Sequence, residues 1–265
     1  MICDFHTHLY DEDDYAHALA ETAHTLSIDK MCIGGGEARY GMASNDAVQR
    51  HAIEYPDLFV PFAAFRLGVD RPSDVARLSD QGFSGLRVAA PPAPYDDEAF
   101  FPVYEAAQAL DMPILFHTGM LPPTPLDRAL DVRSDRMRPV LLDGVARHFP
   151  ALSIVGCGLG WPWYEEAAEL LGLHPNIYFD MSGTTLRKKD LDFFAGLLGA
   201  APSTLLDRPH CGAACRRLLF GTAARHEKMP EIECNYERLF RSMTLDEDVV
   251  DGIMGNTAAK ILGLG

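Results

Sequence analysis

The sequence lacks any run of about 18 uninterrupted apolar residues, the length that a helix needs to cross a bilayer. Its first residues, MICDFHTHL, contain neither a basic leader nor a long apolar segment. We therefore expect a cytoplasmic protein that does not span a membrane.

Positive charge is also scarce. The chain has 23 lysine and arginine residues against 38 aspartate and glutamate residues, which gives a formal net charge of −15. Proteins that bind nucleic acid neutralise phosphates with lysine and arginine, and no cluster of these residues offsets the acidic excess here. The composition therefore argues against a nucleic-acid partner and leaves a small molecule as the expected substrate.

The cysteines form no recognisable disulfide framework, because they are spread along a long chain without an export signal. One cluster, HCGAAC at 210–215, lacks the two close Cys or His pairs that are typical of a zinc site, so we expect buried thiols there. The six cysteines are Cys3, Cys32, Cys157, Cys211, Cys215 and Cys234.

Apolar runs of strand length alternate with helical segments along the whole chain. With 48% hydrophobic residues the chain can bury a large core, and near-continuous apolar strands are typical of a parallel sheet covered by helices. Eight such units predict an α/β fold, a single-domain (β/α)8 TIM barrel over residues 1–265. The longest connection without an obvious element, 120–136, is predicted to be a lid or active-site loop. The predicted strands are 2–6, 31–35, 59–65, 85–90, 113–119, 152–158, 177–183 and 218–222.

The carboxyl ends of the predicted strands carry the polar side chains of interest, since βα loops build the site of a TIM barrel. His6 and His8 lie two apart on the first strand, so both imidazoles point to the same side. His117 ends the fifth strand. Three neutral imidazoles can hold Zn²⁺ with an open position for water, which would ionise more easily there. The alternative is that each histidine is a hydrogen-bonded residue of the core.

Five motifs together resemble the metal-dependent amidohydrolase superfamily, in the branch that contains aminocarboxymuconate-semialdehyde decarboxylase. They are DFHTHL, GFSGLRVAAPP, MPILFHTG, FPALSIVGCGLGWPWYEEAAELLGLHPNIYFDMSG and LLFGT. The resemblance implies a (β/α)8 barrel with one divalent metal, most often Zn²⁺ with Mn²⁺ or Fe²⁺ as alternatives. It makes His6, His8 and His117 the metal ligands, and it implies a homodimer.

The sequence departs from the family pattern at three positions. Gly158 stands where the resemblance implies a histidine beside the water, Ala223 where it implies an aspartate that binds metal and accepts a proton, and Ala89 where many members have a histidine. Loss of a positioned base costs about 10²–10⁴-fold in rate, and loss of a donor to developing negative charge about 10²–10³-fold.

Other residues could take over the missing catalytic roles. Asp180 on the seventh strand and His226 on the loop after the eighth are the candidates, with a structural hydrogen bond and a solvated loop as their respective alternatives. Strand alternation predicts that Cys157 points away from the face of Gly158. Asp4 shares the strand face of His6, where it would either orient an imidazole or belong to a buried network.

Two residues are candidates for substrate binding. Arg87 on the fourth strand could bind a substrate carboxylate with both guanidinium nitrogens, or it could pair with Asp180 or another acid inside the barrel. Trp161, after the glycine-rich segment, could line the pocket, although WPW also suits the start of a helix.

The sequence thus supports two functions. The first is a metal-dependent hydrolase or decarboxylase-like lyase of small organic acids, in which a non-standard group replaces the missing base. The second is a pseudoenzyme that keeps the three histidines and binds a small ligand without turnover, as Gly158, Ala223 and Ala89 indicate. A barrel with purely structural histidines is the third alternative.

Overall fold

Eight parallel strands follow one another around the molecule in chain order, from β1 to β8. The computed structural model describes residues 1–36, 38–200 and 212–264. The strands are β1 (Cys3–His8), β2 (Lys30–Gly34), β3 (Phe59–Ala64), β4 (Gly85–Val88), β5 (Ile114–Phe116), β6 (Ile154–Gly156), β7 (Ile177–Asp180) and β8 (Leu218–Leu219).

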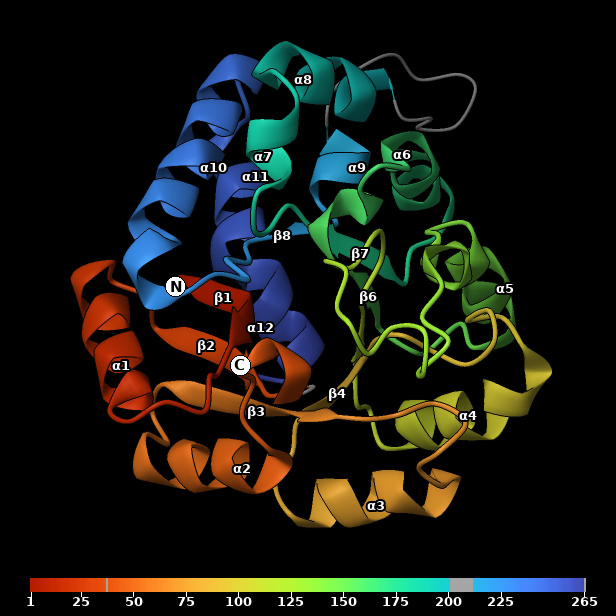
Figure 1. Cartoon of the computed structure of the whole chain (residues 1–265). Helices are drawn as coiled ribbons and strands as arrows, with labels where there is room; N and C mark the ends of the chain where they lie inside the picture. Colours follow the sequence, from red (N-terminus) through yellow and green to blue (C-terminus); the bar gives the residue numbers. More distant parts are fainter. Residues whose placement is uncertain (37, 201–211, 265) are drawn as a thin grey trace.

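Helices surround the strands on the outside (Figure 1). Because each connection between parallel strands must return to the same end of the sheet, a crossover helix is the usual solution. The helices are α1 (Tyr15–Thr25), α2 (Asn45–Glu54), α3 (Pro72–Asp80), α4 (Phe101–Ala109), α5 (Leu141–His148), α6 (Tyr164–Leu173), α7 (Thr185–Lys188), α8 (Leu191–Ala200), α9 (Gly212–Cys215), α10 (Met229–Met243), α11 (Glu247–Asp251) and α12 (Thr257–Leu262). None of the helices in the described residues is long and apolar enough to cross a membrane.

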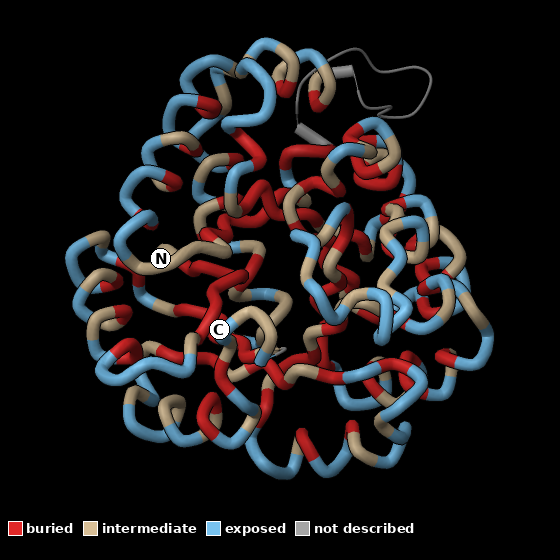
Figure 2. Tube along the Cα trace, viewed as in Figure 1, coloured by how far each residue is buried: buried red, intermediate tan, exposed pale blue. Residues whose placement is uncertain are grey.

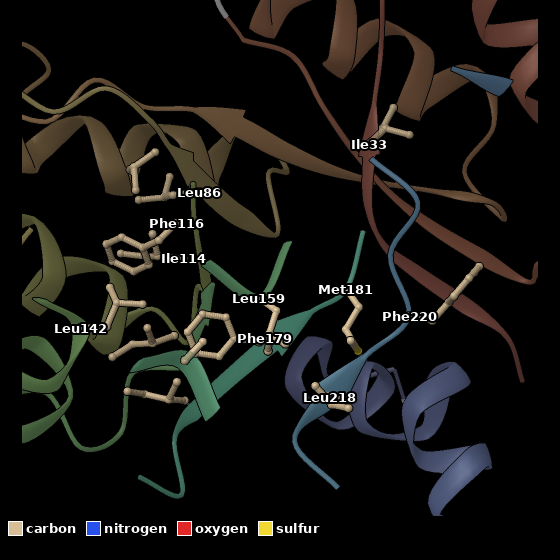
Figure 3. Packing of buried hydrophobic residues seen from close by; sticks show 14 of the residues in the cluster. Ile33, Leu86, Ile114, Phe116, Leu142, Leu159, Phe179, Met181, Leu218 and Phe220 are labelled. Carbon is tan, nitrogen blue, oxygen red and sulfur yellow. The ribbon is translucent and has the colours of Figure 1, made fainter. Parts of the chain in front are cut away.

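The main core lies between the strands and the helices. Figure 2 shows buried strands inside a ring of helices whose outer faces are exposed. Side chains such as Leu86, Phe116 and Phe179 leave their strands outward and pack in this layer, as Figure 3 shows. Burying such an apolar side chain contributes about 1.5–3 kcal/mol, so this layer supplies most of the drive to fold.

A second, smaller apolar cluster fills the inside of the barrel. Its members alternate along the strands with the outward-facing ones, as the pleat of a strand requires. Ala258 of α12 belongs to the same cluster, with Ile261 and Leu262 packed against it, so the C-terminal helix closes one end of the barrel. The cluster consists of Cys3, Phe5, Cys32, Val60, Phe62, Leu115, Val155, Cys157, Leu219 and Ala258.

Hydrogen bonds from β1 to the segment around β8 bring the two ends of the sheet together. Phe5 N donates to Phe220 O at 2.9 Å, and Ala223 N donates to His6 O at 2.6 Å. The register between β1 and β2 shifts between Asp4 and Thr7, where β1 carries one extra residue. Such a bulge changes which side chains face the barrel interior.

The predicted TIM barrel is confirmed, although several strands are shorter than the apolar runs suggested. β4 ends at Val88, β6 at Gly156 and β8 at Leu219, because the chain turns into its βα loops earlier. Ala89 therefore follows its strand rather than belonging to it. In the HCGAAC cluster, the side chain of Cys215 is buried, while His210 and Cys211 lie outside the described residues.

Candidate functional site

The bulge in β1 places two histidines together inside the barrel mouth. Phe5 faces the interior, with its ring 5.5 Å from that of Phe62. The extra residue lets His6 face the interior as well, and its ring centroid lies 5.0 Å from that of His8. The two residues are 3% and 9% exposed. β1 thus presents two buried imidazoles side by side at its carboxyl end.

Asp4 belongs to a buried hydrogen-bond network. The sequence left open whether Asp4 orients an imidazole or belongs to such a network, and the structure shows the network. Its carboxylate accepts hydrogen bonds from the backbone N–H and the hydroxyl of Thr222, at 3.0 and 2.6 Å, and from the backbone N–H of His6 at 3.0 Å. Burial raises the pKa of Asp4 to about 6, although these hydrogen bonds oppose the change. Asp4 therefore ties the start of the site on β1 to the loop after β8.

Asp180 at the end of β7 holds the ring of His6. Its Oδ2 lies 2.8 Å from Nδ1 of His6, and its Oδ1 accepts from the backbone N–H groups of Gly158 and Ser182, at 2.6 and 2.9 Å. Burial alone would raise the pKa of Asp180, but the neighbouring His6 and these hydrogen bonds hold the pKa below its ordinary value. An ionised Asp180 keeps the proton of His6 on Nδ1 and leaves a lone pair on Nε2.

Two buried imidazole nitrogens have no hydrogen-bond partner among the described residues. They are Nε2 of His6 and Nε2 of His117. His117 follows β5, and burial, together with the positive charge of Arg87, lowers its pKa to about 3. A buried polar atom without a partner is costly, and a neutral imidazole with a free lone pair is the form that binds a metal.

Arg87 on β4 reaches into the same mouth. Its Nη1 lies 2.5 Å from Nδ1 of His8 and its Nη2 lies 3.4 Å from Nε2 of the same ring, while the carbonyl oxygen of Gly35 is 3.4 Å away. Burial, followed by the charge of Arg87, holds the pKa of His8 well below its ordinary value. The guanidinium forms no ion pair with a carboxylate in the described part of the chain, so the alternative pairing with Asp180 is not observed.

One group of three potential metal ligands has its donor atoms within 4.8 Å of one another, and its members are His6, Cys157 and Asp180. His8 and His117 are not in that group. Strand alternation predicts that Cys157 points away from the face of Gly158. The structure places Cys157 in the barrel interior, because the alternation of β6 continues past its end and Cys157 follows Val155 inward. Burial, followed by the charge of Asp180, raises the pKa of the Cys157 thiol well above its ordinary value.

The three departures from the family pattern have distinct surroundings. Gly158 has φ +61°, and a Cβ added there would lie 3.3 Å from Oγ1 of Thr185. Ala223 has φ +43° and lies on the loop after β8, bound to His6 through its backbone. Neither position offers a side chain that could bind metal or accept a proton, and Ala89 beyond β4 offers none either.

The remaining candidates, Trp161 and His226, lie outside the group of three donors formed by His6, Cys157 and Asp180, which we call the central group. His226 Nε2 lies 3.3 Å from Glu227, and its ring packs on Tyr15 with 5.4 Å between centroids. The amine of Lys188 sits 3.1 Å from the ring centre of Trp161. The sequence reasoning missed Lys188 and also Tyr10, whose ring lies 6.1 Å from His8. The position of Tyr10, two residues beyond His8, was the available signal.

The long loop after β5 reaches toward the loop that follows β2. Arg39 Nη1 donates to Oδ1 of Asp127 at 2.8 Å, and the Tyr40 hydroxyl donates to Pro122 O at 3.1 Å. Because β2 and β5 are three strands apart in the sheet order, these contacts connect well-separated parts of the rim. The predicted loop is therefore anchored beside the mouth.

The sequence profile of the amidohydrolase family matches residues 3–264, and the chain belongs to this family. The match confirms the resemblance drawn from the five sequence motifs. No match was found among the curated proteins.

Solved structures share the fold at low sequence identity. An uncharacterized TIM-barrel protein from Bordetella bronchiseptica is 19% identical, with a TM-score of 0.74 over 99% of this chain and 98% of that chain. A dihydroxybenzoic acid decarboxylase from Polaromonas sp. JS666, solved with manganese and the inhibitor 2-nitroresorcinol, is 16% identical, with a TM-score of 0.65 over 99% and 97%. The 4-oxalomesaconate hydratase of Rhodopseudomonas palustris is 16% identical, with a TM-score of 0.64 over 99% and 96%.

Proposed function

We propose that this chain is a metal-dependent hydrolase or decarboxylase-like lyase that acts on a small carboxylated compound in the barrel mouth. The main observation in support is that the Nε2 atoms of His6 and His117 are buried without a hydrogen-bond partner among the described residues. The guanidinium of Arg87 lies close enough to affect the pKa of His117. Membership of a family of enzymes supports it.

The donors present fit a divalent ion. His6 has its Nδ1 fixed by Asp180 and its Nε2 without a partner, which is the usual arrangement behind a metal-binding imidazole. His117 offers a second unpartnered nitrogen, and His8 would complete the set by turning from Arg87. When bound, Zn²⁺, Mn²⁺ or Fe²⁺ supplies Lewis acidity and lowers the pKa of water.

The protein's own groups bind and orient the substrate. Arg87 is partly exposed at the mouth and has no carboxylate partner within the described ranges, so it can accept a substrate carboxylate in a two-point hydrogen bond. Tyr10, beside His8, and Trp161, below Lys188, supply aromatic surface near the mouth. This combination suits a small aromatic or unsaturated acid.

A second candidate function is the binding of such an acid without turnover. It is favoured by the hydrogen bonds that occupy Asp180, since both of its oxygens already accept N–H donors. Among the described residues no other carboxylate joins the central group of donors. The two functions share the binding site and differ in the presence of a proton acceptor.

Metal analysis of the purified protein tests the first function. We expect about one Zn²⁺, Mn²⁺ or Fe²⁺ per chain, bound far more weakly by His6→Ala and His117→Ala variants. His24→Ala is the matched control, because this histidine is exposed on α1. A wild-type chain without stoichiometric metal would overturn the metal-dependent function.

Turnover then separates the two functions. Metal-loaded protein is assayed for hydrolysis and decarboxylation of aromatic and unsaturated acids, and binding of the same acids is measured by calorimetry. Binding with turnover supports the enzyme, whereas binding without turnover supports the second candidate. Cytoplasmic location and a homodimer are further parts of the proposal, and light scattering in solution tests the dimer.

A further inference from the structure

The thiol of Cys157 is one of three donor groups that meet inside the barrel mouth. Its sulfur and donor atoms of His6 and Asp180 lie within 4.8 Å of one another. Cys157 is 4% exposed and His6 is 3% exposed, so these donors are shielded from bulk water. In a tetrahedral site the ligand atoms lie about 3.5 Å apart, given metal–ligand distances of about 2.0–2.3 Å. Small side-chain movements would bring the group to that spacing.

The hydrogen bonds of Asp180 leave Cys157 as the anionic donor that is still available. Oδ2 of Asp180 accepts from His6, and Oδ1 accepts from Gly158 and Ser182. If Asp180 bound a metal directly, the ion would compete with the N–H donors that fix both His6 and the turn after β6. The Nε2 atom of His6, in contrast, is buried without a partner.

A bound divalent ion would also favour an anionic ligand at this position. A divalent ion here would lie near the guanidinium of Arg87, and imidazoles bind a metal as neutral ligands. Like charges at close range in a buried site repel strongly, so the ion needs an anionic ligand of its own. Cys157 becomes that ligand when its thiol proton is released to solvent and its sulfur donates an electron pair to the ion.

We propose that Cys157 is a ligand of the divalent ion, together with His6, and that Asp180 orients His6 from behind. The proposal rests on the proposed metal-dependent function and specifies its metal. A thiolate is a soft ligand that suits Zn²⁺ and Co²⁺, whereas carboxylate and water ligands suit Mn²⁺ and Mg²⁺. The site therefore selects Zn²⁺ over Mn²⁺.

Cobalt spectroscopy on the full chain tests the assignment without an activity assay. Protein freed of metal by a chelator is titrated with Co²⁺, and its absorption spectrum is recorded. A sulfur ligand gives a near-ultraviolet charge-transfer band, and nitrogen or oxygen ligands give only visible ligand-field bands. We expect both sets of bands in the wild-type chain. We also expect Zn²⁺ to displace Co²⁺ at concentrations where Mn²⁺ does not.

Cysteine variants assign the charge-transfer band. Cys157→Ser and Cys157→Ala should lose it and should bind Co²⁺ about 100-fold more weakly, since loss of a residue behind a ligand already costs about 10–100-fold. Cys234→Ser, an exposed thiol on α10, should keep the band. Circular dichroism checks that each variant folds. If the Cys157 variants do not fold, a wild-type spectrum without a charge-transfer band still overturns the role of Cys157.

The outcomes separate this inference from the proposed function. Visible bands without a charge-transfer band would show an ion held by imidazoles, which overturns the role of Cys157 and leaves the metal-dependent function standing. A charge-transfer band that persists in Cys157→Ser would also overturn the role of Cys157. No stoichiometric Co²⁺ or Zn²⁺ would overturn both.

Discussion

The guanidinium of Arg87 lies against the imidazole of His8, with Nη1 2.5 Å from Nδ1. A guanidinium forms a weaker hydrogen bond with a neutral imidazole than with a carboxylate. An anion that binds here would therefore give Arg87 a stronger hydrogen-bond partner than His8.

Replacing Arg87 tests its role in substrate binding. We expect Arg87→Met to raise the KM or Kd for a carboxylated substrate about 10–100-fold, because a hydrogen bond to a charged group contributes about 1.5–3 kcal/mol. The metal content should be unchanged. Arg238→Met, at an exposed position of α10, is the control, and equal effects of both variants on binding would contradict the assignment.

Asp180→Asn should weaken metal binding about 10–100-fold while the chain stays folded. The amide presents a donor to Nδ1 of His6, so His6 moves its proton to Nε2 and loses the free lone pair. Metal affinity is measured by competition with a chelating dye. Asp4→Asn is the matched buried control, because Asp4 binds Thr222 rather than an imidazole. An unchanged affinity in Asp180→Asn would show that His6 does not need this carboxylate.

Ala223→Asp should raise metal affinity and, if the missing base limits catalysis, raise the rate by about 10²-fold or more. The backbone at 223 has φ +43°, a conformation that aspartate and asparagine adopt more readily than most residues. Ala223→Asn is the control for size and polarity. Gly158→His is expected to lower stability by about 1–2 kcal/mol, because Gly158 has φ +61°. Equal rates for Ala223→Asp and Ala223→Asn would argue against a missing base.

The loop after β5 should become less protected at low pH. The hydrogen bonds from Thr124 and, after them, the charge of Arg39 hold the pKa of Asp127 below its ordinary value. The anchored loop is therefore favoured above that ordinary value, near pH 3.9, and the benefit is lost as the pH falls through the lower pKa.

Hydrogen–deuterium exchange measures the effect on the anchored loop. Below about pH 3.9, we expect the amides in 121–132 to lose protection about 2–5-fold, relative to their intrinsic exchange rates. Asp127→Asn should remove the dependence. A pH-independent wild-type loop would contradict the role of the Arg39–Asp127 pair.

The barrel and the histidine pair could be predicted because they follow from periodic patterns. Apolar runs of strand length alternate with helical segments, and His6 and His8 lie two apart on one strand. The side chain directions at the strand ends could not be predicted in the same way. The bulge in β1 sends both Phe5 and His6 inward, and no residue type in that segment marks it.

Cys157 shows how a local turn changes the site. The sequence reasoning assigned the inward direction to position 158, but the strand direction continues through Cys157 and the chain turns at Gly158 with φ +61°. The contact between Arg87 and His8 was equally out of reach, since it depends on the distance between β1 and β4 across the barrel. Such relationships follow from the closed geometry rather than from spacing along the chain.

The C-terminal helix has a consequence for how the protein is made. Ala258, Ile261 and Leu262 of α12 complete the apolar filling of the barrel, and the turn at Gly255 lies directly against the backbone of Met1 and Cys3. During synthesis the first strand leaves the ribosome long before α12 does. We therefore expect the apolar interior face of β1 to stay incompletely buried until α12 has been synthesised and packs onto it.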